Sequence, residues 1–145
     1  MSIFEAEFKV QWADCDANNH FRNTAFLDYA AQTRFLYFNS VGFPPAAFAE
    51  HGIGPVVLED NVTYRRELRL LEDFVVQFEA SGFNANGSRF HLINRILTSD
   101  RKVSAEIRSK GVWLNLKKRA PTPPPDKLLM AMQSLAKSDD YADID

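Results

Sequence analysis

A polar stretch near the amino terminus contains the side chains that could do chemistry. Residues 13–24 read ADCDANNHFRNT and include two aspartates, Asp14 and Asp16, a histidine, His20, and an arginine, Arg22. An ionised carboxylate can act as a general base or as a nucleophile, and histidine can exchange protons near neutral pH. The stretch is therefore a candidate site for general acid–base or nucleophilic chemistry.

The stretch ends where a helix is predicted to begin, and a helix start offers a second chemical group. Residues 24–41 run TAFLDYAAQTRFLYFNSV, with Asn23 as the predicted N-cap and Gly42 just past the predicted end. The first amides of a helix have no internal acceptor and lie at the positive end of the helix dipole, so they suit an oxygen that becomes negative. The predicted donors are the amides from about Phe21 to Thr24.

A purely structural interpretation of the same stretch is also open. Asp and Asn are favoured in turns and caps because their side chains bond to nearby backbone groups. On this interpretation five residues only shape the loop: Asp14, Asp16, Asn18, Asn19 and Asn23. We keep it for Asp14, and Asn23 is expected to cap the helix rather than to react. Cys15 is expected to point into packing, because no histidine and acid spacing supports a cysteine nucleophile.

Composition limits the other functions. The chain has 145 residues, 46% of them hydrophobic and 25% charged, with a net charge of -2, as expected for one domain that needs no disulfide or metal to fold. This charge gives no field for nucleic acid or an anionic membrane, and no apolar run approaches the roughly 20 residues that span a bilayer.

A single cysteine and the absence of a leader pattern predict a cytoplasmic protein. Neither a metal nor another cofactor is expected, because metal-ligand spacing, a glycine-rich phosphate loop and a G-x-S-x-G motif are absent.

Alternating apolar residues predict strands before and after the helix. The predicted strands cover residues 4–12, 56–69, 74–83, 88–98 and 103–116. The sequences LLED and NANG are predicted to form hairpin turns, and a change in apolar phase in the last strand predicts a bulge near Gly111. In the first strand, Trp12 is assigned to the buried face.

The order of these elements predicts an α+β fold. The helix is apolar over most of its circumference, so it must be wrapped, and a curved five-stranded antiparallel sheet could surround it. Residues 1–120 would form this unit. Residues 121–145 would add a proline-rich linker, a helix capped by Asp126 and a solvated acidic tail within the same domain. Such a sheet leaves edge strands that need cover, which favours a dimer.

The motif and the element order together resemble a known family. The run V-x-W-x-D-x-D-A-x-x-H-x-x-N, followed by a helix ending in TRFLYFNSVGF, is similar to the signature of hotdog-fold acyl-CoA thioesterases of the 4-hydroxybenzoyl-CoA thioesterase type. The resemblance covers roughly residues 3–118. It implies a hotdog fold and hydrolysis of an acyl-CoA thioester to free acid and CoA.

The resemblance also implies which residues act. Asp16 matches the family's catalytic carboxylate, which is a nucleophile or a general base, and His20 would be a further member of the site. The family commonly has glycine where this chain has Asn19, and asparagine is the next best residue for a left-handed backbone. Two other acids remain as alternatives, namely Asp28 in the first turn of the helix and Glu59 on the second strand.

Partners follow from the resemblance as well. Such domains pair sheet edges into a homodimer, often within a homotetramer, with active sites at the boundary, and the strand VVLEDNVTYRREL is the candidate boundary. Basic residues that could meet the phosphates of coenzyme A are Arg65, Arg66, Arg69, Arg89, Lys117, Lys118 and Arg119, with Glu59, Arg65 and Arg66 taken as substrate-binding. Two other functions stay open: a non-catalytic module that binds an acyl or CoA group, and a hotdog dehydratase or hydratase.

Overall fold

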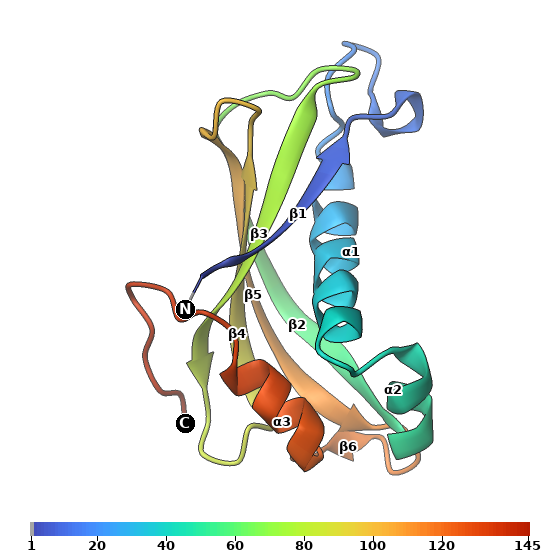
Figure 1. Cartoon of the computed structure of the whole chain (residues 1–145), viewed down its shortest axis with the longest axis vertical. Helices are drawn as coiled ribbons and strands as arrows, with labels where there is room; N and C mark the ends of the chain where they lie inside the picture. The colour runs from blue at the N-terminus through green and yellow to red at the C-terminus, as the bar shows by residue number, and fades with distance from the viewer. Residues whose placement is uncertain (1) are drawn as a thin grey trace.

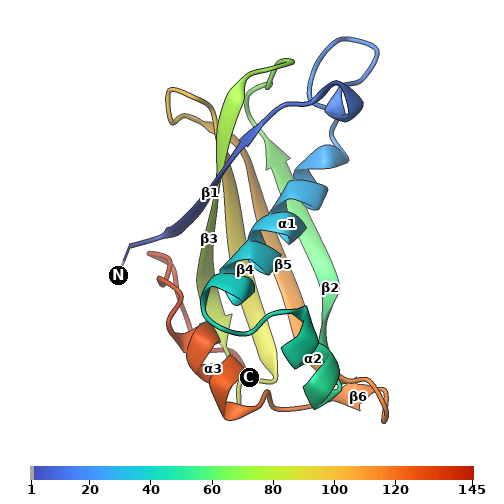
Figure 2. The same ribbon diagram turned by 45° about the vertical axis from the view of Figure 1, so that its right-hand side comes forward.

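One long helix lies against a curved antiparallel sheet (Figures 1 and 2). This computed structural model describes residues 2–145. The elements follow the order β1 (Phe4–Lys9), the 3₁₀ turn η1 (Trp12–Asp14), α1 (Ala25–Ser40), α2 (Pro45–His51), β2 (Ile53–Tyr64), β3 (Asp73–Phe83), β4 (Arg89–Leu97), β5 (Val103–Asn115), β6 (Ala120–Pro121) and α3 (Asp126–Gln133).

The sheet has the strand order β1-β3-β4-β5-β2, with the short β6 added to β5. Five main strands around one long helix confirm the predicted α+β hotdog fold. The NANG turn joins β3 to β4 as a hairpin, as predicted. The prediction of a hairpin at LLED is wrong, because β2 pairs with β5 and the chain must cross the end of the sheet to reach β3.

Helix α1 is held by two clusters of buried side chains on the concave face of the sheet. The cluster near its N-terminus contains Phe21, Phe26 and Phe74, and the cluster near its C-terminus contains Phe38 and Trp113. Burying each such side chain contributes about 2 kcal/mol. This wrapping fixes the axis of α1, and therefore the direction in which its first amides point.

The boundaries of two elements differ from prediction. Strand β1 ends at Lys9, and Trp12 then lies in η1 with 76% of its surface exposed, so its assignment to the buried face was wrong. Helix α1 begins at Ala25 with Thr24 as N-cap, one residue later than predicted. The amide of Ala25 donates to the carbonyl of Arg22, so a turn precedes the helix and displaces Asn23 from the cap position.

The predicted bulge lies on the neighbouring strand. The register between β2 and β5 shifts between Val57 and Glu59, where Gly111 and Lys110 are their partners. Strand β5 keeps its phase across Gly111, since Ile107, Ser109 and Trp113 are all buried. The extra residue, Leu58, instead reverses the side-chain phase of β2.

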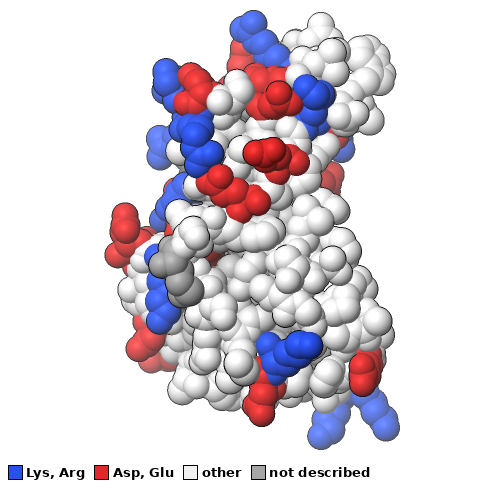
Figure 3. All heavy atoms as spheres, viewed as in Figure 1, with Lys and Arg blue, Asp and Glu red and all other residues white. Residues whose placement is uncertain are grey.

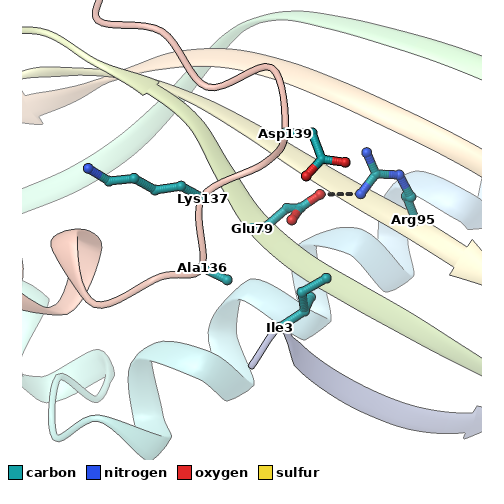
Figure 4. Close-up of a pocket in the computed structure, with 6 residues that line it drawn as sticks. All are labelled: Ile3, Glu79, Arg95, Ala136, Lys137 and Asp139. Carbon is teal, nitrogen blue, oxygen red and sulfur yellow. Dashed lines mark hydrogen bonds and ion pairs between the residues drawn. The ribbon is translucent and has the colours of Figure 1, made fainter. Parts of the chain in front are cut away.

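The acidic C-terminal segment is bound to the sheet and is not the solvated tail that its composition predicts. The amides of Ala142 and Ile144 donate to the carbonyls of Ser81 and Phe83 at 3.0 and 3.1 Å. A Cβ at Gly82 would lie 2.6 Å from the carbonyl oxygen of Ala142, so this glycine makes room for the segment. Figure 4 shows the segment passing Glu79 and Arg95, which are ion-paired.

Among residues 2–145, no helix is both long enough and apolar enough to cross a lipid bilayer.

Candidate active site

The polar loop is fixed to the fold by Phe21. Its ring is buried and packs against Phe26 and Phe74 with centroid distances of 4.7 and 5.3 Å. Its amide donates to the carbonyl of Leu68 at 2.8 Å, and Cys15 forms a β-bridge with it. The side chain therefore anchors the loop, and its amide, predicted to hold the oxyanion, is already used within the chain.

Asp14 ties the loop to the central helix. Its carboxylate accepts the hydroxyl of Tyr29 at 2.6 Å and the amide of Gln11 at 3.0 Å. Burial, followed by the hydrogen bond to Asp14, raises the pKa of Tyr29 from 10.0 to about 12. The carbonyl of Asp14 also accepts the amide of Arg22 at 2.7 Å, so that amide too is occupied. These bonds give Asp14 a positioning role.

Asp16 lies at the start of a tight turn with one carboxylate oxygen held by the backbone. Oδ1 accepts the amides of Asn18 at 2.8 Å and His20 at 3.2 Å. Oδ2 has no hydrogen-bond partner among residues 2–145, and the side chain belongs to an exposed residue. Asn19, at the tip of this turn, has φ = 61°, the left-handed conformation expected of it. The turn thus orients the carboxylate and leaves one oxygen available.

His20 points toward a carboxylate that the sequence analysis did not single out. Its Nε2 lies 2.8 Å from Oε2 of Glu67, and both side chains are close to half exposed. Arg69 bonds the other oxygen of Glu67 and, with the charge of His20, holds the pKa of Glu67 below its ordinary value. An ionised Glu67 favours one orientation of the imidazole, as a second carboxylate commonly does for a functional histidine.

Two free amides lie at the start of α1. The backbone N–H groups of Asn23 and Thr24 bond to no acceptor among residues 2–145, in contrast to those of Phe21 and Arg22. Tyr64 fixes the turn, because its hydroxyl donates to the carbonyl of Asn23 at 3.1 Å. The helix start thus offers two adjacent donors at the positive end of the α1 dipole.

A cleft of about 310 Å³ opens beside these amides. It is lined by Asn23, Phe26, Tyr64, Arg65, Arg66 and Glu67. The two arginines were predicted to bind substrate, and the structure brings them next to the helix start. Asp16 is outside the lining of this cleft, although His20 links its turn to Glu67 at the cleft wall.

Two predicted alternatives lie elsewhere. Asp28 is exposed and its carboxylate is 3.5 Å from Arg22. Glu59 is 3.4 Å from the ammonium of Lys110 and lines a cavity with His91, on the sheet face opposite α1. The bulge at Leu58 explains this placement, because it turns Asp60 rather than Glu59 toward α1.

Other basic residues are dispersed in one chain. Arg69 is paired with Glu67, and Arg89 shares the cavity of Glu59. Residues 117–119 follow β5 at the end of the molecule opposite the start of α1 (Figure 1). Figure 3 shows Lys and Arg mixed with Asp and Glu over the upper part of one face. Phosphate recognition would therefore rest on local groups and not on one extended basic surface.

The sequence alone gave no partner for Arg34, which α1 carries into the interior. Its Nε donates to Asn94 at 2.9 Å and its Nη2 donates to Ser109 at 2.8 Å. The hydroxyl of Ser109 in turn donates to Asp60 at 2.5 Å. The sequence does contain a signal for these partners, because the polar residues Asn94 and Ser109 stand at strand positions where apolar residues are expected.

Comparison with known proteins identifies the family of the chain. The family model of the thioesterase-like superfamily matches residues 10–132. This range includes the polar loop, α1 and strands β2 to β6. The chain belongs to the thioesterase-like superfamily. Membership confirms the resemblance inferred from the loop motif and assigns the protein to the thioester hydrolases. Comparison with curated protein sequences gives no match.

Solved structures share the fold of this superfamily member at low identity. A 1,4-dihydroxy-2-naphthoyl-CoA thioesterase from Synechocystis is 17% identical, with a TM-score of 0.81 over 92% of this chain and 98% of the other. The hypothetical protein SAV2348 from Staphylococcus aureus, in complex with CoA, is 17% identical, with a TM-score of 0.81 over 92% and 86%. The PA2801 protein of Pseudomonas aeruginosa is 27% identical, with a TM-score of 0.77 over 90% and 99%.

Proposed function

We propose that this protein hydrolyses an acyl-CoA thioester to a free acid and CoA, with Asp16 as the catalytic carboxylate. The observation that carries the proposal is the joint geometry of the loop and α1. One oxygen of Asp16 is held by two amides while the other is free, and two unpaired amides start the helix that follows. The proposal requires a substrate carbonyl that contacts the free oxygen of Asp16 and these two amides at the same time.

The amides of Asn23 and Thr24 would receive the thioester carbonyl oxygen. Their bonds strengthen as that oxygen becomes negative, which lowers the barrier to attack. Asp16 would either attack the carbonyl carbon, giving an anhydride that water then cleaves, or take a proton from the attacking water. In both routes the C–S bond breaks and the sulfur leaves as the CoA thiolate, which then takes up a proton. His20, oriented by Glu67, would contact the substrate beside this carboxylate.

Arg65 and Arg66 would bind phosphate groups of the CoA portion. Both line the cleft beside the helix start, and guanidinium groups suit phosphate oxygens because they donate paired bonds. The structure of SAV2348 with CoA supports this choice of leaving group. The thioesterases for 1,4-dihydroxy-2-naphthoyl-CoA and gentisyl-CoA among the similar structures support it as well.

The active assembly would be a homodimer joined at β2. This strand is at the edge of the sheet, where its outer side has no neighbour among residues 2–145. Val57 and Leu58 on it are 41% and 63% exposed. A second copy paired edge to edge would cover these apolar groups and satisfy the free backbone groups. Further assembly into a tetramer stays a prediction.

A non-catalytic module that binds acyl or CoA groups is the second candidate. The bonds from Oδ1 of Asp16 to Asn18 and His20 are also those of a carboxylate that only closes a turn. Such a module would bind CoA esters without releasing a thiol.

The direct test is thiol release from a panel of short, long and aryl acyl-CoA esters, with ester binding measured in parallel by calorimetry. Release from at least one ester, at a rate proportional to enzyme, is the expected result. Binding without release would favour the module, and neither binding nor release of any ester would contradict both candidates.

A further inference from the structure

A second cavity lies between α1, α2 and the edge strand β2. It has a volume of about 410 Å³, and its walls are almost entirely apolar, including Phe35, Phe38, Phe48, Val57 and Trp113. Helix α2 lies beside the lower end of β2 and closes this side of the fold (Figure 2). A cavity of this size and lining suits a hydrocarbon or aryl group.

Arg34 is the one charged residue in the wall of this cavity. Its two protein partners, Asn94 and Ser109, are both neutral, and it forms no ion pair with any of residues 2–145. A guanidinium has five N–H donors, so three remain beyond the two that these bonds use. No other hydrogen bond of this guanidinium to residues 2–145 is present, and the side chains around it in the cavity wall are apolar.

Asp60 is the nearest counter-charge of Arg34, but it is linked to Arg34 by hydrogen bonds only through Ser109. The Ser109 hydroxyl accepts from Arg34 and donates to Asp60, so the three groups form one directed chain. Burial lowers the pKa of Arg34, and the charge of Asp60 opposes this effect. Arginine nevertheless stays protonated in proteins, so a cation is present in the cavity wall.

Another cavity of this fold contains an arginine whose charge is balanced by carboxylates in direct contact with it. It has a volume of about 510 Å³ and is lined by Glu79, Arg95 and Asp139, among others (Figure 4). Arg95 pairs there with Glu79 and also with Glu106, so its charge is balanced by direct contacts. Arg34 lacks such contacts, which leaves it able to bind a ligand.

We propose that the apolar cavity receives the acyl group of the substrate and that Arg34 binds an oxygen acceptor which this group carries beyond its apolar part, such as a terminal carboxylate or hydroxyl. The inference rests on the proposed function, since it names the acyl class for the same enzyme. The start of α1 and Arg34 are nine residues apart, or roughly 13 Å along the helix. An acyl group that reaches from the carbonyl to this acceptor would have to be extended over about this distance.

The test compares kcat/KM for pairs of acyl-CoAs of equal length, with and without a terminal carboxylate or hydroxyl, in a length series that spans this distance. At the best length, the wild type should prefer the oxygenated ester by about tenfold or more, the effect of a hydrogen bond to a charged group. Arg34→Met should abolish the preference, and Arg34→Lys should keep part of it. Gln32→Met, at an exposed position of the same helix, should leave it unchanged. Equal rates for both members of every pair in the wild type would overturn the inference.

A binding measurement separates this inference from the proposed function and does not depend on Arg34→Met folding. Trp113 lines the cavity and Trp12 is exposed, so fluorescence of the Trp12→Phe protein reports on the cavity. The probes are N-methylamides of the same acyl groups. Tighter binding of the oxygenated amide, without turnover of any ester, would sustain the cavity assignment while the hydrolase proposal fails. Equal binding of both amides would overturn the cavity assignment.

Discussion

The carboxylate of Asp16 accepts the backbone amide of His20 at 3.2 Å, across a turn that leads directly to the start of α1. This bond places the proposed catalytic carboxylate and His20 on one hydrogen-bonded turn. Phe21 anchors that turn in the core, and Glu67 orients the imidazole from the other side. The position of the carboxylate is therefore fixed relative to the core by these backbone bonds and by the burial of Phe21.

The first prediction concerns the tip of this turn. Asn19 has φ = 61°, a conformation that glycine adopts freely and that a β-branched residue strongly disfavours. Asn19→Gly should keep activity and stability close to wild type. Asn19→Val should lower the free energy of unfolding by about 1 to 2 kcal/mol and reduce turnover as the turn distorts. Urea unfolding and thiol release measure these effects, and an unaltered Asn19→Val protein would contradict the role of the turn.

The second prediction concerns alkaline pH and the bond from Tyr29 to Asp14. The fold raises the pKa of Tyr29 from 10.0 to about 12, so it favours the protonated hydroxyl. The contribution of this hydroxyl to the free energy of unfolding is therefore complete below pH 10. That contribution should be lost as the pH rises from 10 to 12. Tyr29→Phe should be less stable than wild type near neutral pH, by about 1 kcal/mol for a lost hydrogen bond. Urea unfolding at several pH values should show that the difference in free energy of unfolding between wild type and Tyr29→Phe becomes smaller above pH 10. A difference that stays constant would count against the bond.

The third prediction concerns the C-terminal segment. A methyl group at Gly82 would lie 2.6 Å from the carbonyl oxygen of Ala142, so Gly82→Ala should displace the segment from β3. Hydrogen exchange of the Ala142 and Ile144 amides should speed up markedly in this variant. Ser81→Ala, next to it on the same strand, is the matched control and should leave their exchange slow. Equal protection in wild type and Gly82→Ala would show that the segment is held by other contacts.

The fourth prediction concerns the β2 edge. Leu58→Asp places a charge on an apolar residue that is 63% exposed at the proposed dimer boundary, and it should shift the mass measured by light scattering toward the monomer. Met130→Asp is a matched control on α3, where the side chain is 66% exposed away from β2. Should both variants keep the mass of the wild type, or should the wild type itself be monomeric, the boundary is placed wrongly.

The helix, the strands and the loop motif could be predicted because each is encoded locally. Alternating apolar residues specify strands, and the polar run before the apolar segment specifies a helix start. The sequence LLED was wrongly predicted to be a hairpin turn, because a turn sequence does not reveal whether the two strands that it connects pair with each other. The bulge was assigned to the wrong strand. The apolar residues of β5 change from odd to even positions near Gly111, but the buried positions do not, and the extra residue is Leu58 of the partner strand β2.

The C-terminal segment and Arg34 show a different limit. Acidic composition predicts a solvated tail, yet the backbone of Ala142 bonds to β3. Backbone hydrogen bonds of this kind cannot be inferred from amino-acid composition. For Arg34, the partners Asn94 and Ser109 are 60 and 75 residues away in the chain. Only the register of β4 and β5 brings them together. Availability of the amides could not be predicted for the same reason, since Leu68 occupies that of Phe21.

The measurement that tests the account most directly is the thiol-release rate of Asp16→Asn beside that of Asp28→Asn. The amide oxygen of asparagine can still accept from Asn18 and His20, so the turn should persist, which thermal unfolding can verify. The account predicts a fall in kcat of about a hundredfold or more for Asp16→Asn and little change for Asp28→Asn. A folded Asp16→Asn protein that turns over at the wild-type rate would contradict it.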